Sequence, residues 1–234
     1  TLSPDDVESL TVLKDAQADI YGTIAANGVI LVTTKAGKRN SKAKISYNAY
    51  TGIQETSRKL PMLNGTEYAL LLNERYANGG KPLPFPNVSG IGKGTDWQDE
   101  VFNDAVPMHS HELSVSGGSE NINYAVSGSY LSQDGIIGGK KTGFERSTAR
   151  IALGADITSK LKLKTNVTYT YQNQLRINDF ALGSVLFNAL NVPSTQSPYD
   201  SNGDYSLVPS SGGIGNEVIN PLAQVANTFN NYDL

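Results

Sequence analysis

Two histidines, His109 and His111, stand two positions apart in a segment that alternates like a β-strand. On a strand they would point to the same face, an arrangement that metal ligands use. A third ligand is not evident, because Glu112 would lie on the opposite face. The segment therefore favours two polar residues in a sheet, with a metal site as the alternative.

A second set of oxygen-bearing residues has the spacing with which a calcium loop begins: Asp200, Asn202 and Asp204. Such a loop needs a glycine at its sixth position and a glutamate at its twelfth. Tyr205 and Ser211 stand at those positions here. We therefore expect a turn, with calcium binding as the alternative, and no other metal or cofactor.

Trp97 is the sole tryptophan of the chain. An indole can stack on a sugar ring, anchor a protein at a membrane interface, or fill a core. Asp96 is placed to begin a short helical turn in which Trp97 would share an apolar side with Val101 and Phe102. Packing is the favoured interpretation, and ligand binding is the alternative.

The residue inventory excludes several kinds of enzyme. The chain has no cysteine, which removes thiol nucleophiles, thiolate metal sites and disulfides. With two histidines in one strand and no other, a Ser-His-Asp hydrolase is not supported. Residues 90–95 resemble a phosphate loop, but Gly94 rather than Ser or Thr follows Lys93, and no strand precedes them. We predict that the chain is not an enzyme.

Composition and charge narrow the possible partners. The formal net charge is −3, and no basic cluster is large enough to indicate nucleic-acid binding. Apolar runs such as 29–32 are far too short for a membrane helix. A transmembrane β-strand needs only about 9–11 alternating residues, so a membrane barrel stays open. A polar mix with 12 Tyr against 6 Phe suits β-barrels, and also carbohydrate-binding β-proteins.

The opening of the chain predicts a small α/β unit. Ser3 is placed to cap a short helix whose first residue is Pro4. We expect a buried strand at 10–13, a second short helix at 14–21, and a strand of β-branched residues at 29–34. Residues 35–44 form a polar, basic linker.

After the linker the hydrophobic period changes to two. Five segments alternate apolar with polar residues: 45–53, 108–117, 122–130, 149–157 and 161–171. These segments exceed the usual strand length of about 5–6 residues. Their second face carries Lys, Arg, Asp, Asn and Gln, so we expect it to lie in water. A membrane barrel and a long soluble antiparallel sheet both give this pattern.

The connections differ in length in an ordered way. The turns at 118–121 and 158–160 are short, whereas the connections at 54–107 and from 175 onward are long and contain helices, such as 65–77. In an antiparallel sheet the short turns fall at one end and the long connections at the other. Outer-membrane barrels have short periplasmic turns and longer outer loops.

Several segments, in order along the chain, resemble TonB-dependent receptors of the SusC/RagA branch. They read VESLTVLKDA at 7–16, IYG at 20–22, ANGVILVTTK at 26–35, TDWQDEVF at 95–102, LSVSGGS at 113–119, DGII at 134–137, FER at 144–146 and NPLA at 220–223. The combination is specific, and it covers nearly the whole chain apart from the loop 54–94.

This resemblance implies an importer in the cell outer membrane that binds a nutrient, usually a glycan or a peptide. In this branch a surface lipoprotein of the SusD type acts as a lid, and the TonB energy-coupling complex supplies energy. The family's TonB-contacting residues lie near its N-terminus, outside the segments matched here, so no residue is assigned to TonB. Lipid of the outer membrane would surround the barrel.

The same resemblance predicts a mainly β fold: the C-terminal part of a small α/β plug followed by an incomplete antiparallel transmembrane β-barrel with helical outer loops. We expect residues 1–40 to end the plug and residues 41–234 to begin the barrel with about five strands. Plugged transporters have about 22 strands and lipid tolerates no open edge, so we expect a piece of a larger receptor. The alternative is a soluble carbohydrate-binding β-sheet domain.

Overall fold

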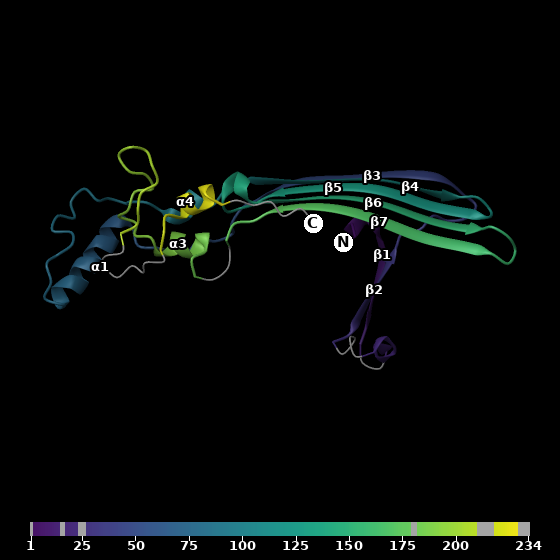
Figure 1. Ribbon diagram of the computed structural model, residues 1–234, viewed down its shortest axis with the longest axis horizontal. Coiled ribbons are helices and arrows are strands. Elements are labelled where there is room, and N and C mark those ends of the chain that lie inside the picture. Colours follow the sequence, from purple (N-terminus) through teal and green to yellow (C-terminus); the bar gives the residue numbers. More distant parts are fainter. Residues whose placement is uncertain (1, 15–16, 23–26, 179–181, 210–217, 229–234) are drawn as a thin grey trace.

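The computed structural model describes residues 2–14, 17–22, 27–178, 182–209 and 218–228. Two antiparallel sheets dominate it: a two-stranded sheet of β1 and β2, and a five-stranded sheet in the order β3-β4-β5-β6-β7. The small sheet projects from one face of the large one (Figure 1). The prediction of a mainly β chain with antiparallel sheets is confirmed.

The small sheet is a hairpin of β1 (Val7–Leu13) and β2 (Val29–Thr34). The prediction that the strand at 10–13 is buried is wrong, because Leu10 is 63% exposed and Val12 is 57% exposed. A two-stranded ribbon has no second layer of its own to cover its faces, so alternation alone does not bury it. Helical structure before and after β1 is limited to short 3-10 turns, η1 (Pro4–Asp6) and η3 (Asp19–Tyr21), in the described residues.

The large sheet is a meander of long strands joined in sequence order. Its strands are β3 (Ser41–Gln54), β4 (Val106–Gly118), β5 (Ile122–Asp134), β6 (Gly143–Asp156) and β7 (Lys162–Leu175). Each has 13 or 14 residues and extends about 45 Å at about 3.4 Å per residue. The five alternating segments are therefore strands, each longer than its alternation indicated.

The register aligns residues of one kind across the sheet. One face of the sheet carries Ile45, Val115, Val126, Ile151 and Val167 in a single row. Ile45 is 70% exposed and Val167 is 59% exposed, so nothing in the described chain covers this face. The opposite face is polar, and the β1–β2 hairpin lies on that side.

The long connections gather at one end of the sheet, as antiparallel order requires (Figure 1). They contain the helices α1 (Gly65–Asn78), α2 (Trp97–Val101), α3 (Val185–Asn191) and α4 (Pro221–Ala226). A hydrophobic core joins α2, α3 and α4, and α1 contributes no residue to it: Trp97, Val101, Ile177, Val185, Ala189, Val192 and Val218, with Leu222 and Val225 packed against them. None of the helices in the described residues is long and apolar enough to cross a membrane.

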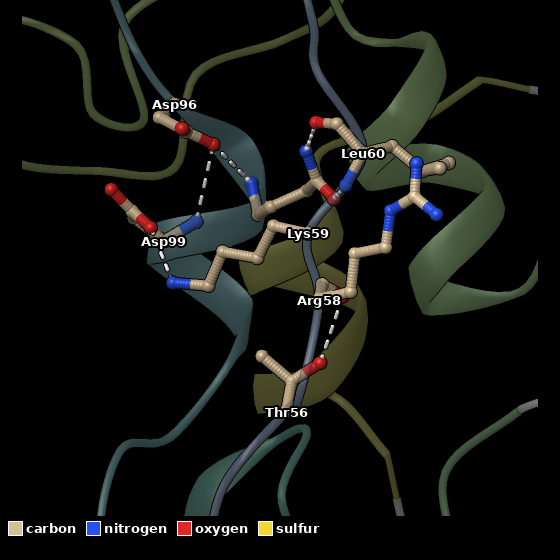
Figure 2. A network of polar contacts seen from close by, with 7 residues as sticks. Thr56, Arg58, Lys59, Leu60, Asp96 and Asp99 are labelled. Carbon is tan, nitrogen blue, oxygen red and sulfur yellow. Dashed lines mark hydrogen bonds and ion pairs between the residues drawn. The ribbon is translucent and has the colours of Figure 1, made fainter.

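The segment after β3 that contains Lys59 and Leu60 is bound to α2 by an ion pair and hydrogen bonds (Figure 2). Lys59 pairs with the Asp99 carboxylate at 2.5 Å, and this hydrogen bond raises the pKa of the Lys59 ammonium. The backbone of Leu60 exchanges two hydrogen bonds with the Gln98 side chain, at 2.8 and 2.7 Å. Asp96 caps α2 by accepting from the backbone N–H of Gln98 and of Asp99, as the sequence predicted.

Candidate functional site

The N-terminal segment docks on the polar face of the large sheet through buried side chains. Ser3 donates its hydroxyl to the Glu112 carboxylate on β4 at 3.0 Å. The Asp6 carboxylate accepts a hydrogen bond from Ser127 on β5 at 2.5 Å. Ser3, Asp6 and Glu112 are each at most 4% exposed. Ser3 stands at the predicted N-cap position before Pro4, but its hydroxyl makes no capping hydrogen bond and binds the sheet instead.

Arg150 on β6 is the centre of this contact. Its guanidinium lies 3.5 Å from the Asp6 carboxylate, and it donates to the Thr34 hydroxyl at 2.7 Å and to the Lys35 carbonyl at 2.8 Å. A further hydrogen bond at 3.0 Å from its Nε to Asn166 orients the side chain. Arg150 is 2% exposed. Arg150 of the large sheet therefore links the residue just before β1 to the end of β2.

The linker after β2 is fixed against the short-turn end of the sheet. Asn123 donates its side-chain amide to the Gly37 carbonyl at 2.9 Å. Arg39 forms a bidentate pair with Asp156, with N–O distances of 2.5 and 2.7 Å. This hydrogen-bonded pair raises the pKa of the Arg39 guanidinium above its ordinary value. These hydrogen bonds hold the basic linker against the large sheet.

The polar face was predicted to lie in water, and this is wrong where the N-terminal segment covers it. A small cavity of about 130 Å³ remains between the two, lined by Asp6, Glu8, Lys35, Ser116 and Arg150 among others. Its polar lining and volume suit bound water. The docking residues Asp6, Glu112 and Arg150 were not identified from the sequence. Single charges on an alternating polar face carry no local signal of the partner that buries them.

A larger cleft of about 790 Å³ opens among the long connections at the helical end of the large sheet. Its walls come from the residues just before α1, from α1 and α2, and from the end of α3. They include Met62, Tyr68, Leu71, Lys93, Asp99 and Asn191. Burial raises the pKa of the Tyr68 phenol in this wall. Clefts of this size, with apolar walls and a few polar groups, are where proteins bind small ligands.

Trp97 lies in α2, is 3% exposed and is also one of the residues that line this cleft. Its indole N–H donates to the Pro193 carbonyl at 3.0 Å, and the ring belongs to the hydrophobic core of the helices. Stacking on a sugar requires an exposed ring face. The surroundings of Trp97 are those of a packing residue.

Asp200, Asn202 and Asp204 form the tip of a short hairpin. The Asp200 carboxylate accepts from the backbone N–H of Asn202 at 2.8 Å and of Asp204 at 3.0 Å. Tyr199 and Tyr205 pair across its base with ring centroids 5.4 Å apart. These are the contacts of a turn stabilised by its first aspartate.

His109 and His111 lie on the apolar face of the large sheet, in the half nearer the outer loops. Their rings are 5.7 Å apart, and the Tyr47 hydroxyl is hydrogen-bonded to His111 Nδ1 at 2.7 Å. Tyr130 lies beside His109 with ring centroids 5.8 Å apart. Among the described residues no group of three His, Asp or Glu side chains converges on a metal-sized site.

The glycine-rich loop at 90–95 hydrogen-bonds to the start of α1 and does not have the arrangement of a phosphate-binding loop. Gly65 donates its backbone N–H to the Lys93 carbonyl at 2.7 Å, and Thr66 donates to the Gly92 carbonyl at 3.0 Å. A phosphate loop would turn N–H groups outward. Here its carbonyls accept from the first turn of a helix, and the glycines permit this path.

Known proteins similar to this chain are receptors. It is 34% identical over 229 residues to the TonB-dependent receptor P26 of Formosa agariphila, covering 96% of this chain and 22% of that receptor. It is 36% identical over 209 residues to the TonB-dependent receptor SusC of Bacteroides thetaiotaomicron, covering 88% of this chain and 20% of that receptor. The chain spans about a fifth of the length of these relatives.

Solved structures agree with the sequence comparison. The RagAB peptide transporter matches with a TM-score of 0.75 and 26% identity, over 95% of this chain and 28% of that chain. The RagAB peptide importer in its closed-closed state matches with a TM-score of 0.72 and 27% identity, over the same shares. No family model matches the chain. The two comparisons, together with a polar sheet face held to an N-terminal hairpin, show that this chain belongs to the SusC/RagA branch of the TonB-dependent receptors, as a piece of such a receptor.

Proposed function

We propose that the chain is part of an importer in the cell outer membrane that binds and takes up a nutrient. The observation that carries this is the sidedness of the large sheet. Its polar face holds the N-terminal segment through Arg150, and its apolar face is uncovered. A barrel wall that encloses a plug and faces lipid needs this arrangement.

We propose a division of the chain into the end of a plug, residues 1–40, and the first part of a barrel wall, residues 41–234. The start of β3 at Ser41 supports this boundary. The clamp of Arg39 on Asp156 lies just before it. Two hydrogen-bonded sheets on either side of a fixed linker suit a plug seated in a wall.

The depth of the apolar face supports a position in a membrane. From Ile122 to Tyr130 on β5, the strand rises about 27 Å, or about 21 Å along the membrane normal for a tilt of about 40°. The apolar band of outer-membrane barrels is about 25 Å tall. Beyond Tyr130 the aligned residues become polar, with Glu145 and Asn173 in the next row. The apolar surface thus ends where a bilayer would end.

The proposed substrate is a glycan or a peptide, and the proposed partners are a surface lipoprotein of the SusD type and the TonB complex. The names of the relatives support the TonB complex and a peptide: two are named TonB-dependent receptors, and the solved neighbours are named the RagAB peptide importer and the RagAB peptide transporter. The glycan and the SusD-type lipoprotein rest on the resemblance to the SusC/RagA branch. The cleft among the outer loops lies on the side from which a nutrient would arrive.

Growth of a strain that lacks the full-length receptor tests the proposal. The strain is grown on a panel of single glycans and peptides as carbon or nitrogen source, beside the same strain with the gene restored. Loss of growth on one class of nutrient, regained on restoration, is the expected result. Unchanged growth on every nutrient, or recovery of the receptor as a freely soluble periplasmic protein, would contradict it.

A further inference from the structure

We propose that Arg146 on β6 binds a carboxylate of the incoming nutrient. Arg146 and Arg150 lie on the same strand and the same polar face, four positions apart. The guanidinium of Arg150 makes three hydrogen bonds and one ion pair, all with other residues of this chain. Arg146 differs in that respect, and the inference rests on the importer function proposed above.

Arg146 lacks partners in the described part of the chain. Its Nε is buried without a hydrogen-bond acceptor, and the ion pairs of the described residues do not include its guanidinium. Thr148, the next residue on the same face, is 5% exposed, and its hydroxyl also lacks a partner. Buried polar groups without partners are uncommon and call for a specific explanation.

The surroundings of Arg146 leave its charge unbalanced. The register aligns it with uncharged residues, and the next row toward the outer loops is uncharged as well: Tyr50, Ser110, Leu131 and Gln172, then Gly52, Met108, Gln133, Phe144 and Gln174. Glu112 lies one row nearer the short turns, where it accepts from Ser3. No acidic side chain lies in the row of Arg146 or in the next row toward the outer loops, and a cation so placed attracts an anion.

The position of Arg146 suits a ligand that enters from the outside. The contacts of the N-terminal segment with the strands reach the row of Glu112 and Thr148 and include the rows below it. Arg146 is one row farther toward the outer loops, just beyond the last of these contacts. A nutrient that has passed the loops and rests on the plug would meet this residue.

A carboxylate is the group that fits. The guanidinium of arginine is a planar fork that pairs with both oxygens of a carboxylate. Such a group comes from two sources among the proposed nutrients: the C-terminus or acidic side chain of a peptide, and the uronic acid of a glycan. A hydroxyl beside the fork, as on Thr148, can donate to the same anion.

Binding measurements on the purified full-length receptor test this. The probes are short peptides with free or amidated C-termini, and uronic acid oligosaccharides beside neutral ones of equal length. For Arg146→Gln we expect binding of carboxylate-bearing probes to weaken about 10- to 100-fold, with neutral probes unaffected. Arg146→Lys, which keeps the charge but not the fork, should lose less. The class of probe that loses affinity identifies the source of the carboxylate.

Lys164→Gln is the matched control, because it removes one positive charge from an exposed residue on the same face of β7, near the short turns. We expect its affinities to equal those of the unchanged receptor. The proposal is overturned if Arg146→Gln binds all probes normally, if it loses neutral and acidic probes equally, or if the unchanged receptor has no preference for carboxylates. It is also overturned if Arg146→Gln lowers the melting temperature without changing selectivity, since the arginine then has a structural partner elsewhere in the receptor. Unchanged binding of neutral probes would leave the importer function standing.

Discussion

Arg150 and Asp6 illustrate how a buried charge differs from an exposed one of the same type. Both are nearly inaccessible to solvent, and each is satisfied by groups from another segment of the chain. Removing one member of such a pair leaves the other buried without compensation, which costs more than the pair contributes. By contrast, Lys59 and Asp99 form an exposed pair, and such pairs contribute little.

Asp6→Ala should loosen the N-terminal segment from the sheet, because Arg150 and Ser127 lose a buried partner. We expect a loss of about 3–5 kcal/mol in docking free energy. The measurement is urea-induced release of the segment in the full-length receptor, followed by protease cleavage near the linker. Glu8→Ala, at an exposed residue of the same segment, is the control and should change little. Equal urea midpoints for the two variants would argue against the assigned role of Asp6.

Trp97→Ala should lower the temperature at which the cluster of α2, α3 and α4 unfolds, because the substitution leaves a large cavity in the core. The expected cost is about 3–5 kcal/mol, and Trp97→Phe, which keeps a ring but loses the bond to Pro193, should cost less. Protease resistance of the outer loops against temperature measures both. Leu71→Ala, at a residue 55% exposed, is the comparison. A loop cluster as resistant in Trp97→Ala as in Leu71→Ala would refute the packing role.

At the scale of elements, the linker after β2 is fixed by the close approach of its backbone to the large sheet. The backbone of the linker passes so close to the sheet that Gly37 has no room for a side chain. A Cβ there would lie 2.0 Å from the Tyr124 carbonyl oxygen and 2.5 Å from that of Gly117. Glycine is required by this close approach rather than by a turn.

Gly37→Ala should therefore displace the linker and expose Lys38 and Arg39 to trypsin. Forcing a methyl group against backbone costs about 1–3 kcal/mol, which predicts cleavage about 5- to 150-fold faster. The rate of cleavage in the folded full-length receptor is the measurement. Gly128→Ala is the control, because a Cβ at Gly128 meets nothing within 4 Å. If both variants are cut at the rate of the unchanged receptor, the linker is not clamped as described.

At the scale of the whole molecule, the two faces of the large sheet define what each side contacts. The row through Val167 is apolar and uncovered, and the neighbouring residue Thr168 belongs to the polar face. In a lipid-facing wall a charged substitution at the apolar position costs much more than one at the polar position. In a sheet with both faces in water the two substitutions differ little.

Val167→Arg should impair insertion, since arginine near the middle of the lipid face of a barrel costs about 2–4 kcal/mol. Thr168→Arg places the same side chain on the polar face and should be tolerated much better. The measurement is the fraction of full-length receptor that migrates as folded barrel, without heating, in outer-membrane preparations. Equal fractions for the two variants would contradict a membrane-facing row at Val167.

Much of the fold follows from periodicity. The strands, the helix at 65–77, the short turn at 158–160 and the cap at Asp96 were all expected from local patterns. Local spacing failed where a residue has a distant partner. Ser3 is placed like a helix cap, yet it binds Glu112, which is 109 positions away. No pattern within a few residues can encode such a pairing.

The sequence by itself determined the alternation of faces, the positions of the strands and the order of short and long connections, because these depend on side-chain period and turn residues within one segment. Tertiary structure alone decided which charges are buried. Arg146 and Arg150 occupy equivalent places in the alternating pattern of β6, but the described residues before β3 hydrogen-bond to Arg150 and make no recorded hydrogen bond to Arg146. Burial depends on what packs above a face, and that is a property of the assembled chain.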